Sequence, residues 1–381
     1  RSEFAVFSDT DVDFMQKAIS LAEHGLFTTT PNPRVGCLIV RDGKVVGQGW
    51  HERAGEAHAE VVALRQAASR ARGATAYITL EPCNHIGKTG PCAEALIQAG
   101  VRAVVAAMED PNPIVAGKGL ARLREAGLDV RCGLLAEKAA ALNPGFILRM
   151  TKGRPWVRAK MACSMDGRVA LANGTSQWIT SPEARADGHA FRARSCLVVT
   201  GVGTVLQDDP LLNVRYVDTP RQPHRLVVDP RLMADPDARF FREPKAMVAT
   251  TADLDNPIHR EGIDRLAARG VELISVASQS GRPGDRLALH DLLRQLADRG
   301  MNEIHLEAGP ALVGGFWSEG VIDEWLVYMA PVFLGQGMPP VSGMPELGSV
   351  EAAPRWRLIG QDPVGDGLRI RLVKPQAVAP Q

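Results

Sequence analysis

The segment EPCNHIGKTGPC, residues 81–92, decides how the first half of this chain is interpreted, because each of its two cysteines directly follows a proline. Upstream, His58 is followed two residues later by Glu60. One imidazole and two thiolates are the number and kind of ligands that hold a Zn²⁺ ion and leave its fourth position open for water. We therefore predict a zinc site made by His58, Cys83 and Cys92, with Glu60 placed to shuttle protons to and from that water.

The residues around these ligands predict local structure that would bring them together. Residues 58–70 have the apolar spacing of a helix, which places His58 at a helix N-terminus. The sequence TAYITL, residues 75–80, is typical of a strand that leads into the first cysteine, and Pro91 begins a second helix. A helix N-terminus and a bound dication both lower the pKa of a thiol, so we expect two thiolates. The arrangement predicts deamination chemistry.

Other interpretations of the cysteines remain open. Free cysteines are often small buried hydrophobic residues, and we expect this of Cys37, Cys132, Cys163 and Cys196. The same interpretation is the alternative for the two cysteines of the segment. A structural zinc site would instead need a fourth protein ligand, which His85 could supply. A zinc-stabilised nucleotide-binding module without turnover is the corresponding alternative to an enzyme.

Length and composition limit the class of protein. The 381 residues are enough for two domains with separate cores. A net charge of +1 gives no electrostatic reason for binding nucleic acid or an anionic membrane, which argues against a deaminase that acts on polynucleotides. The sequence has no apolar run of membrane-spanning length, and we expect a cytoplasmic, reducing compartment in which thiols stay available for metal.

The first half of the chain alternates helices and strands. A hairpin is expected to turn at Asp42-Gly43, with further strands near residues 101–108 and 128–133 and helices near 11–24, 118–127 and 136–148. This pattern predicts a three-layer α/β sandwich with a partly parallel sheet. Residues 149–155, with charges beside Gly153 and Pro155, predict a junction, which gives domains of residues 1–152 and 153–381.

A second α/β pattern follows the junction. Strands are expected at residues 156–164, 196–201, 225–229, 245–251, 271–276 and 302–309, and helices near 182–193, 288–299 and 310–319. The last strands, near 324–335, 355–360 and 368–373, look antiparallel, so we expect a mixed sheet.

Two glycine-containing turns of the second half bear on ligand binding. The sequence Gly201-Val202-Gly203 lacks the third glycine of a Rossmann fingerprint, so we do not predict that fold. The turn after Glu307 opens a helix with small residues, and its free N–H groups suit a phosphate. A packing role for these glycines is the alternative.

Together these motifs resemble known families. The pattern His58-x-Glu60 with Cys83 and Cys92 resembles the cytidine-deaminase superfamily, but its eight residues between the cysteines depart from the two-residue gap of the polynucleotide editors. The longer loop resembles the riboflavin-biosynthesis bifunctional deaminase-reductases. The stretches KMACSMDGR (160–168), SQWITSP (176–182), TVLQDDPL (204–211) and EAG (307–309) are similar, in order, to the dihydrofolate-reductase-like domain of that family. The resemblance covers almost the whole chain.

The resemblance implies a fold, an activity and cofactors. The fold is an N-terminal cytidine-deaminase-like α/β/α domain followed by a dihydrofolate-reductase-like α/β domain with a mixed sheet. The activity is zinc-dependent deamination of a diaminopyrimidinone ribosyl 5′-phosphate, followed by NADPH reduction of its ribosyl group to ribityl. A homodimer through the second domain is also implied.

The resemblance also implies site residues. Substrate contacts are implied at Asn32, His51, Lys88 and Asn112 in the first domain and at Ser176, Arg192, Leu212, Arg215 and Glu307 in the second. NADPH contacts are implied at Ala162, Trp178, Thr204, Asp208, Gly309, Pro310, Ala311, Leu312, Val313, Gly314 and Gly315.

Chemistry supports several of these roles, and ordinary alternatives exist for each. Arg192 and Arg215 are suited to a 5′-phosphate as guanidinium forks, although either could be a solvated surface charge. The two asparagines can bind a pyrimidine edge or a ribose, or can form turns between prolines, and Lys88 can meet a phosphate or solvent. Lys160 and Glu307 are the candidate proton donors or polar partners of the reductase.

Overall fold

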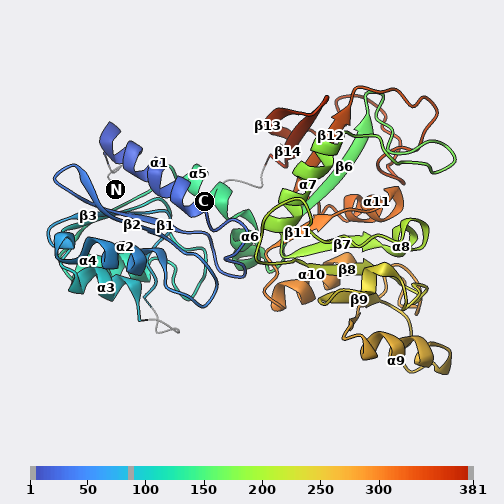
Figure 1. The fold of residues 1–381 in the computed structure, drawn as a ribbon, viewed down its shortest axis with the longest axis horizontal. Helices are drawn as coiled ribbons and strands as arrows, with labels where there is room; N and C mark the ends of the chain where they lie inside the picture. The colour runs from blue at the N-terminus through green and yellow to red at the C-terminus, as the bar shows by residue number, and fades with distance from the viewer. Residues whose placement is uncertain (1–5, 85–89, 376–381) are drawn as a thin grey trace. The chain divides into compact units, whose positions relative to one another are not determined.

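The protein is represented by a computed structural model that describes residues 6–84 and 90–375. The chain divides into two compact units between Gly153 and Arg154 (Figure 1). Each unit has its own sheet and its own apolar cores.

The first unit contains a five-stranded sheet in the order β2-β1-β3-β4-β5. Its strands are β1 (Gly36–Arg41), β2 (Lys44–Trp50), β3 (Thr75–Ile78), β4 (Ala103–Ala106) and β5 (Asp129–Cys132). The hairpin turns at Asp42-Gly43 as predicted, and β1 runs antiparallel to both β2 and β3. The pairs β3–β4 and β4–β5 are parallel, so the predicted partly parallel sheet is confirmed.

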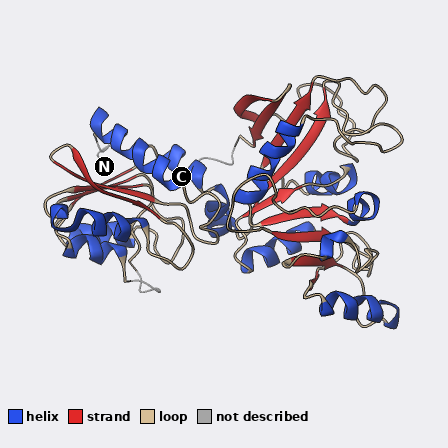
Figure 2. Ribbon diagram, in the orientation of Figure 1, coloured by secondary structure: helices blue, strands red, loops and turns tan. Residues whose placement is uncertain are grey.

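Helices cover both faces of this sheet and complete three layers (Figure 2). The helices are α1 (Asp9–Glu23), α2 (Ala59–Ala67), α3 (Cys92–Gln98), α4 (Lys118–Glu125), α5 (Ala136–Leu142) and α6 (Pro144–Lys152), and a 3₁₀ turn follows α2 at Ala68–Ala71. Phe14 of α1 and Ala139 of α5 pack with Leu38 on one face. Ala63 of α2 and Leu96 of α3 share the core on the other face.

The end of this unit differs from the sequence prediction. A single helix over residues 136–148 is wrong, because the chain breaks at Asn143 and α6 continues to Lys152, into the predicted junction. The Asn143 side chain accepts the backbone N–H of Arg34 at 2.7 Å and donates to its carbonyl oxygen at 2.9 Å. Pro144 then starts a new helix in the first turn, where a missing N–H costs nothing.

The second unit contains a nine-stranded sheet in the order β10-β9-β8-β7-β11-β6-β12-β14-β13. The strands are β6 (Trp156–Ser164), β7 (Leu197–Gly201), β8 (His224–Val228), β9 (Ala246–Thr250), β10 (Glu272–Ser275), β11 (Glu303–Leu306), β12 (Glu324–Ala330), β13 (Arg357–Val364) and β14 (Gly367–Val373). The predicted mixed sheet is confirmed, but the prediction for β12 is partly wrong. It lies parallel to β6 and antiparallel only to β14.

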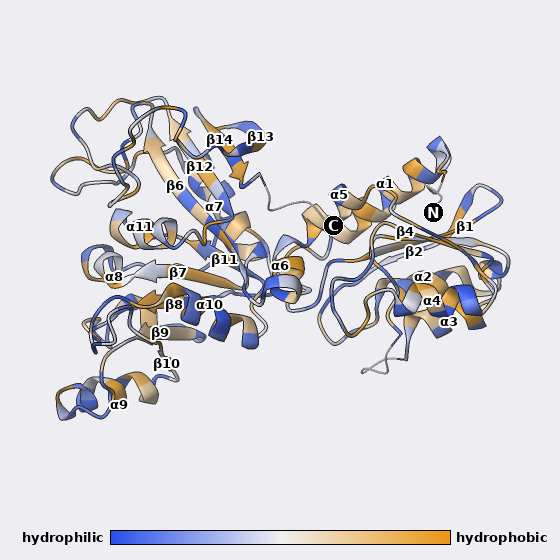
Figure 3. Ribbon diagram, turned by 180° about the vertical axis from the view of Figure 1, so that it is seen from behind, coloured by the Kyte–Doolittle hydropathy of each residue, from blue (hydrophilic) through white to orange (hydrophobic). Residues whose placement is uncertain are grey.

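Helices also cover both faces of the larger sheet. They are α7 (Pro182–Arg194), α8 (Val202–Asp208), α9 (Arg260–Ala268), α10 (Leu289–Asp298) and α11 (Pro310–Ser318), with 3₁₀ turns at Arg239–Phe241 and Pro257–His259. Leu293 of α10 and Phe316 of α11 pack on Val199, whereas Val205 of α8 packs on the other side with Val198. The strands β7 and β8 that they enclose are coloured as largely hydrophobic in Figure 3. Helices α8 and α9 were not predicted.

None of the helices in the described part of the chain has both the length and the apolar composition that crossing a bilayer requires.

Candidate active sites

The predicted zinc ligands of the first unit meet in one place. Nδ1 of His58 lies 3.2 Å from Sγ of Cys92 and 3.6 Å from Sγ of Cys83, and all three ligand atoms lie within 4.8 Å of one another. A tetrahedral Zn²⁺ with ordinary bond lengths would separate nitrogen and sulfur by about 3.6 Å, so the three groups fit this ion. Among the described residues no further histidine, cysteine or carboxylate joins the cluster.

Three local structures carry these ligands. His58 is the N-cap of α2, with extended backbone angles, and Cys92 is the first residue of α3. Pro91 is the N-cap of α3 and so lies one position before the helix proper. The loop after β3 is held to this helix because the backbone N–H of Cys92 lies 3.4 Å from Sγ of Cys83 and donates to it. Two helix N-termini therefore point at the metal position.

Charge in the cluster is set by burial and by shared protons. Glu60, in the first turn of α2, is 3% exposed, and burial raises its pKa to about 7, which suits a group that both takes and returns a proton. A hydrogen bond from Cys92 lowers the pKa of Cys83 to about 4 and the same contact raises the pKa of Cys92. The protein groups alone thus favour one thiolate, and a coordinated dication would deprotonate the second.

Two predicted substrate contacts, Asn32 and His51, are hydrogen-bonded to each other beside the predicted zinc ligand His58. The amide of Asn32 lies 3.1 Å from Nε2 of His51, whose Nδ1 lies 3.1 Å from the carbonyl oxygen of Ala57. Because a carbonyl only accepts, Nδ1 carries the proton and Nε2 accepts from the asparagine. The His51 ring meets the ring of His58 edge to face at 5.4 Å.

The other predicted contacts of this unit have different surroundings. The side-chain oxygen of Asn112 accepts the backbone N–H of Ile114 at 3.1 Å, which is the turn-forming role considered from the sequence. Lys88 and the alternative ligand His85 lie outside the described residues.

Sequence reasoning missed Glu81, which precedes the Pro-Cys pair. This carboxylate is 3% exposed and accepts four backbone N–H groups, from Asp110, Gly117, Gly119 and Leu120, at 2.8–3.2 Å. Two of these N–H groups belong to the first turn of α4, which has no side-chain cap of its own. The available signal was an acidic residue directly after the predicted strand, residues 75–80.

The second unit gathers charged residues at the end of β11. Glu307 receives two hydrogen bonds from Arg192, at 2.5 and 2.9 Å, and lies 3.9 Å from Nζ of Lys160 and 3.1 Å from Nε2 of His305. Burial opposes its ionisation, but Arg192 and Lys160 hold the pKa of Glu307 well below its usual range. Burial also lowers the pKa of Lys160. Arg192 was predicted to bind the phosphate of the substrate. It is hydrogen-bonded to Glu307, which is itself a predicted substrate contact.

The predicted cofactor contacts lie on neighbouring elements. Thr204 and Asp208 belong to α8 after β7, and residues 309–315 belong to the N-cap and first turns of α11 after β11. Strands β7 and β11 are adjacent and parallel, so both helices start at the same edge of the sheet. Ala162 lies on β6, which is the next strand along.

Other predicted residues of this unit have individual surroundings. Trp178 is 69% exposed, and the guanidinium of Arg185 lies 4.3 Å from its ring centroid. Ser176 is partly buried in the same loop. Leu212 is 6% exposed and belongs to an apolar core, so its side chain is occupied by packing. A Cβ added to Gly314 would lie 2.1 Å from the carbonyl oxygen of Ser342, so packing alone requires that glycine.

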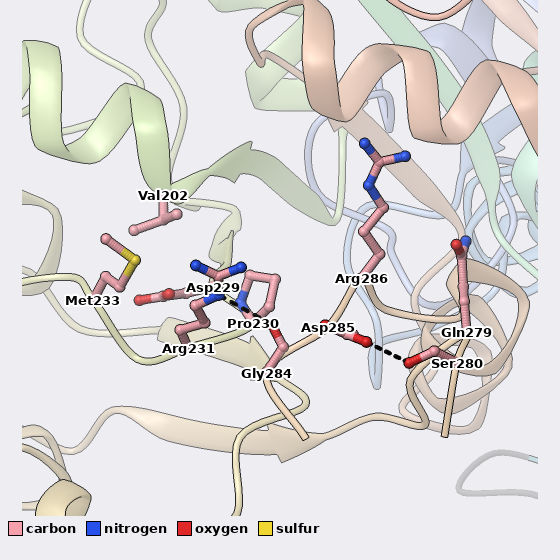
Figure 4. A pocket seen from close by; sticks show the side chains of 10 residues that line it. All are labelled: Val202, Asp229, Pro230, Arg231, Met233, Gln279, Ser280, Gly284, Asp285 and Arg286. Atoms are coloured by element: carbon pink, nitrogen blue, oxygen red, sulfur yellow. Dashed lines mark hydrogen bonds between the residues drawn. The ribbon is translucent and has the colours of Figure 1, made fainter. Parts of the chain in front are cut away.

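A cleft of about 510 Å³ beside these helices was also missed (Figure 4). It is lined by Val202, Asp229, Pro230, Arg231, Met233, Gln279, Ser280, Gly284, Asp285 and Arg286. One oxygen of Asp229 accepts the N–H of Ala234, and the other is buried with no hydrogen-bond partner in the described part of the chain. Asp229 follows β8 directly, so the cleft lies at the same carboxyl edge of the sheet. Its lining comes from two distant loops and from Val202 at the start of α8, which the sequence pattern does not link.

Comparisons with known proteins agree with this division. Residues 8–108 match the cytidine and deoxycytidylate deaminase zinc-binding region, and residues 155–370 match the RibD C-terminal domain. The fold and the two matches define the class, an enzyme that joins a deaminase of the zinc-binding type to a reductase.

Similarity over nearly the full length identifies the family. The riboflavin biosynthesis protein RibD of Escherichia coli is 43% identical and that of Haemophilus influenzae 41%, covering 95% and 96% of this chain and 99% and 97% of theirs. The chain belongs to the RibD family of bifunctional deaminase-reductases in riboflavin biosynthesis.

Solved structures show the same similarity. Acinetobacter baumannii RibD matches with a TM-score of 0.86 at 41% identity, over 96% of this chain and 99% of that one. A diaminohydroxyphosphoribosylaminopyrimidine deaminase/5-amino-6-(5-phosphoribosylamino)uracil reductase from Thermotoga maritima matches with a TM-score of 0.83 at 31% identity, over 96% and 99%. The family implies zinc and a nicotinamide cofactor.

Proposed function

We propose that the first unit deaminates 2,5-diamino-6-(5-phospho-ribosylamino)pyrimidin-4-one and that the second reduces the ribosyl chain of the product to ribityl with NADPH. The convergence of His58, Cys83 and Cys92 beside buried Glu60 carries the first part of this proposal. The reductase part is supported by the charged groups around Glu307 and by the similarity to the Thermotoga maritima enzyme, whose name includes both activities.

In the deaminase, the protein's main task is proton transfer. Zn²⁺ held by His58, Cys83 and Cys92 would supply the Lewis acid that makes a water molecule nucleophilic near neutral pH. Glu60 takes a proton from this water as it attacks C2 and delivers a proton to the amine that leaves as ammonia. Asn32 and His51, already joined by a hydrogen bond, orient the pyrimidine. The buried position of Glu60 excludes competing water from that proton path.

In the reductase, Lys160 and Glu307 are proposed to have different roles, one in proton transfer and the other in orienting the substrate. When bound, NADPH would supply the hydride that C1′ accepts in the ring-opened imine form of the substrate, while the imine nitrogen takes up a proton as the C=N double bond becomes single. Lys160 is the better of the two candidate proton donors, because its pKa is lowered by burial while its neighbours keep Glu307 ionised. Glu307, held in place by Arg192, then orients the sugar hydroxyls as a fixed acceptor.

The substitution Glu60→Gln tests the assignment of the two activities. It removes the group that carries the proton but keeps the side-chain volume, so ammonia release should fall by a factor of about 10³ or more. Reduction of supplied deaminated product should remain within about twofold of the wild-type rate, since that chemistry belongs to other residues. Ammonia and NADPH absorbance are followed in the same reaction. Loss of both activities would contradict two separate sites.

The cleft in Figure 4 is proposed to take the adenosine end of the cofactor and to select NADPH over NADH. Arg231 and Arg286 in its lining supply positive charge for a 2′-phosphate. Replacing both by leucine should raise KM for NADPH by about tenfold or more and leave KM for NADH within about twofold. Arg282→Leu, an exposed arginine of the same loop outside the lining, is the control. An equal rise for both cofactors would reject the assignment.

A homodimer through the second unit is proposed as well. Strand β13 ends the nine-stranded sheet, and Leu358, Ile359 and Leu368 of the β13–β14 hairpin are 52%, 43% and 45% exposed. An unpaired edge with exposed apolar residues is suited to a second copy. Sedimentation equilibrium tests this, and a concentration-independent monomer mass would reject it.

A further inference from the structure

His189, a residue that no motif singled out, lies between the two arginines assigned to the substrate of the reductase. It belongs to α7 and is 4% exposed. Its Nδ1 accepts the backbone N–H of Arg215 at 3.0 Å, and its ring meets the ring of Tyr216 edge to face at 4.7 Å. Its Nε2 lies 3.4 Å from Nη1 of Arg192. A single imidazole therefore connects two separate parts of the site.

The backbone contact fixes which nitrogen carries the proton. A backbone N–H can only donate, so Nδ1 of His189 has no proton, and in the neutral ring the proton must be on Nε2. Burial, and after it the charge of Arg192, lowers the pKa of His189 to about 4, so the ring is neutral at pH 7. The guanidinium also only donates. The 3.4 Å contact between Nε2 and Nη1 thus joins two donors and is not a hydrogen bond.

Two donors that face the same space require an acceptor that the described protein groups do not provide there. Nε and Nη2 of Arg192 donate to Glu307, and Nη1 donates one of its two hydrogens to the carbonyl oxygen of Asn213 at 2.9 Å, which leaves the second Nη1 hydrogen for the space beside His189. The charged groups that act on the ring are three cations, Arg192, Arg215 and Lys160, and one anion, Glu307. Two donors beside an excess of positive charge are best satisfied by an anionic oxygen, which accepts from both.

We propose that His189 is a further substrate-binding residue, which donates its Nε2–H, together with Nη1 of Arg192, to a phosphate oxygen of the ribosyl phosphate substrate. This inference rests on the proposed reductase function of the second unit. A phosphate of the cofactor would offer the same chemistry, so substrate and cofactor must be varied separately in the test.

Two substitutions separate the two nitrogens of His189. Asparagine places its amide near the position of Nδ1 and can still accept from Arg215, but it has no group at Nε2. Glutamine places its amide near the position of Nε2 and can still donate to an oxygen. In the full-length enzyme, His189→Asn should raise KM for the deaminated substrate about tenfold, which corresponds to about 1.4 kcal/mol. Its kcat and its KM for NADPH should change by less than about twofold.

His189→Gln should restore most of the lost affinity, with KM for the substrate within about threefold of wild type. The reverse ranking, with asparagine close to wild type and glutamine weak, would show that His189 only holds the Arg215 segment, and it would overturn the proposal. A rise in KM for NADPH instead of the substrate would overturn it as well, in favour of a cofactor phosphate.

Two controls distinguish a variant that does not fold from one that folds but binds its substrate weakly. NADPH binding, measured by its fluorescence, must be retained by both variants, and ammonia release must stay at the wild-type rate. A wild-type enzyme that does not reduce the deaminated product would reject the proposed function itself, independently of the two variants.

Discussion

At the scale of single residues, local sequence signals predicted the proposed zinc ligands but not other residues on which the two sites depend. His58, Cys83 and Cys92 could be selected because zinc needs a few residue types in a recognisable spacing. His189 and Glu81 had no such signal. The backbone group that His189 accepts is 26 residues away, and those bound by Glu81 are 29 to 39 residues away. Contacts of this range depend on tertiary structure, which spacing along the chain does not encode.

Neighbouring glycines of α11 give a matched test at this scale. Gly314→Ala should lower the thermal midpoint by several degrees, because the new Cβ would lie 2.1 Å from the carbonyl oxygen of Ser342. Gly315→Ala should leave the midpoint unchanged or raise it, since its nearest neighbour is Cδ1 of Leu289 at 3.8 Å and alanine favours a helix by about 1 kcal/mol. Thermal unfolding followed by circular dichroism compares the two. Equal effects would show that the backbone at Ser342 moves enough to accommodate the new Cβ at position 314.

At the scale of elements, strong patterns predicted most helices and strands, and the failures have local causes. The hairpin at Asp42-Gly43 followed from its turn residues. Helix α8 was missed because it has only seven residues, of which Val202, Gly203, Thr204 and Val205 have low helix propensity. The break between α5 and α6 depends on two hydrogen bonds between Asn143 and the backbone of Arg34, which are 109 residues apart in sequence.

The carboxylate of Asp11 connects helix α1 to the sheet through hydrogen bonds. This contact predicts that the stability of the protein depends on pH. Asp11 accepts from Tyr77 of β3 at 2.6 Å and from Arg131 of β5 at 3.0 Å. Burial alone would raise the pKa of Asp11, but hydrogen bonds from Tyr77, Arg131 and Ser8 lower it below its usual range. A lowered pKa in the folded state gives stability that is present above the unfolded pKa of about 4 and is lost as the pH falls below it.

Asp11→Asn should therefore lower the free energy of unfolding by about 2 kcal/mol at pH 7. The difference from wild type should shrink at pH 3 and below, where Asp11 of the unfolded wild-type chain takes up a proton before Asp11 of the folded chain does. Urea denaturation at the two pH values measures this, and the exposed Asp13→Asn on the same helix is the control. A difference that grew toward low pH would contradict the assigned sign.

Glu81 takes the role of an N-terminal cap for helix α4, because it accepts two backbone N–H groups of the first turn. Glu81→Gln replaces one acceptor oxygen by an NH₂ group that faces backbone donors, so the first unit should lose about 1–3 kcal/mol of stability. Ammonia release should fall, because the segment that carries Cys83 is displaced, while reduction of supplied product stays constant. Glu109→Gln, an exposed neighbour, is the control. Unchanged ammonia release at an unchanged melting temperature would show that the four bonds are dispensable.

At the scale of the whole molecule, the sequence predicted two α/β parts but not the arrangement of strands in the second. Strand β6 comes first in that unit, yet it lies in the interior of the sheet, between β11 and β12. The alternation of helices and strands gives the class of architecture, whereas strand order follows from pairings between distant segments. For the same reason the cleft beside β8 could not be predicted, since loops from two parts of the chain form its walls.

The exposed indole of Trp178, beside Arg185, has a practical consequence. An indole in water emits at longer wavelengths than one in an apolar core, and reduced nicotinamides absorb in the range where indoles emit. A nicotinamide that stacks near this ring would both shift and quench its fluorescence. Because Trp178 is one of the predicted cofactor contacts, we expect NADPH binding to change its fluorescence, with Trp178→Phe as the baseline.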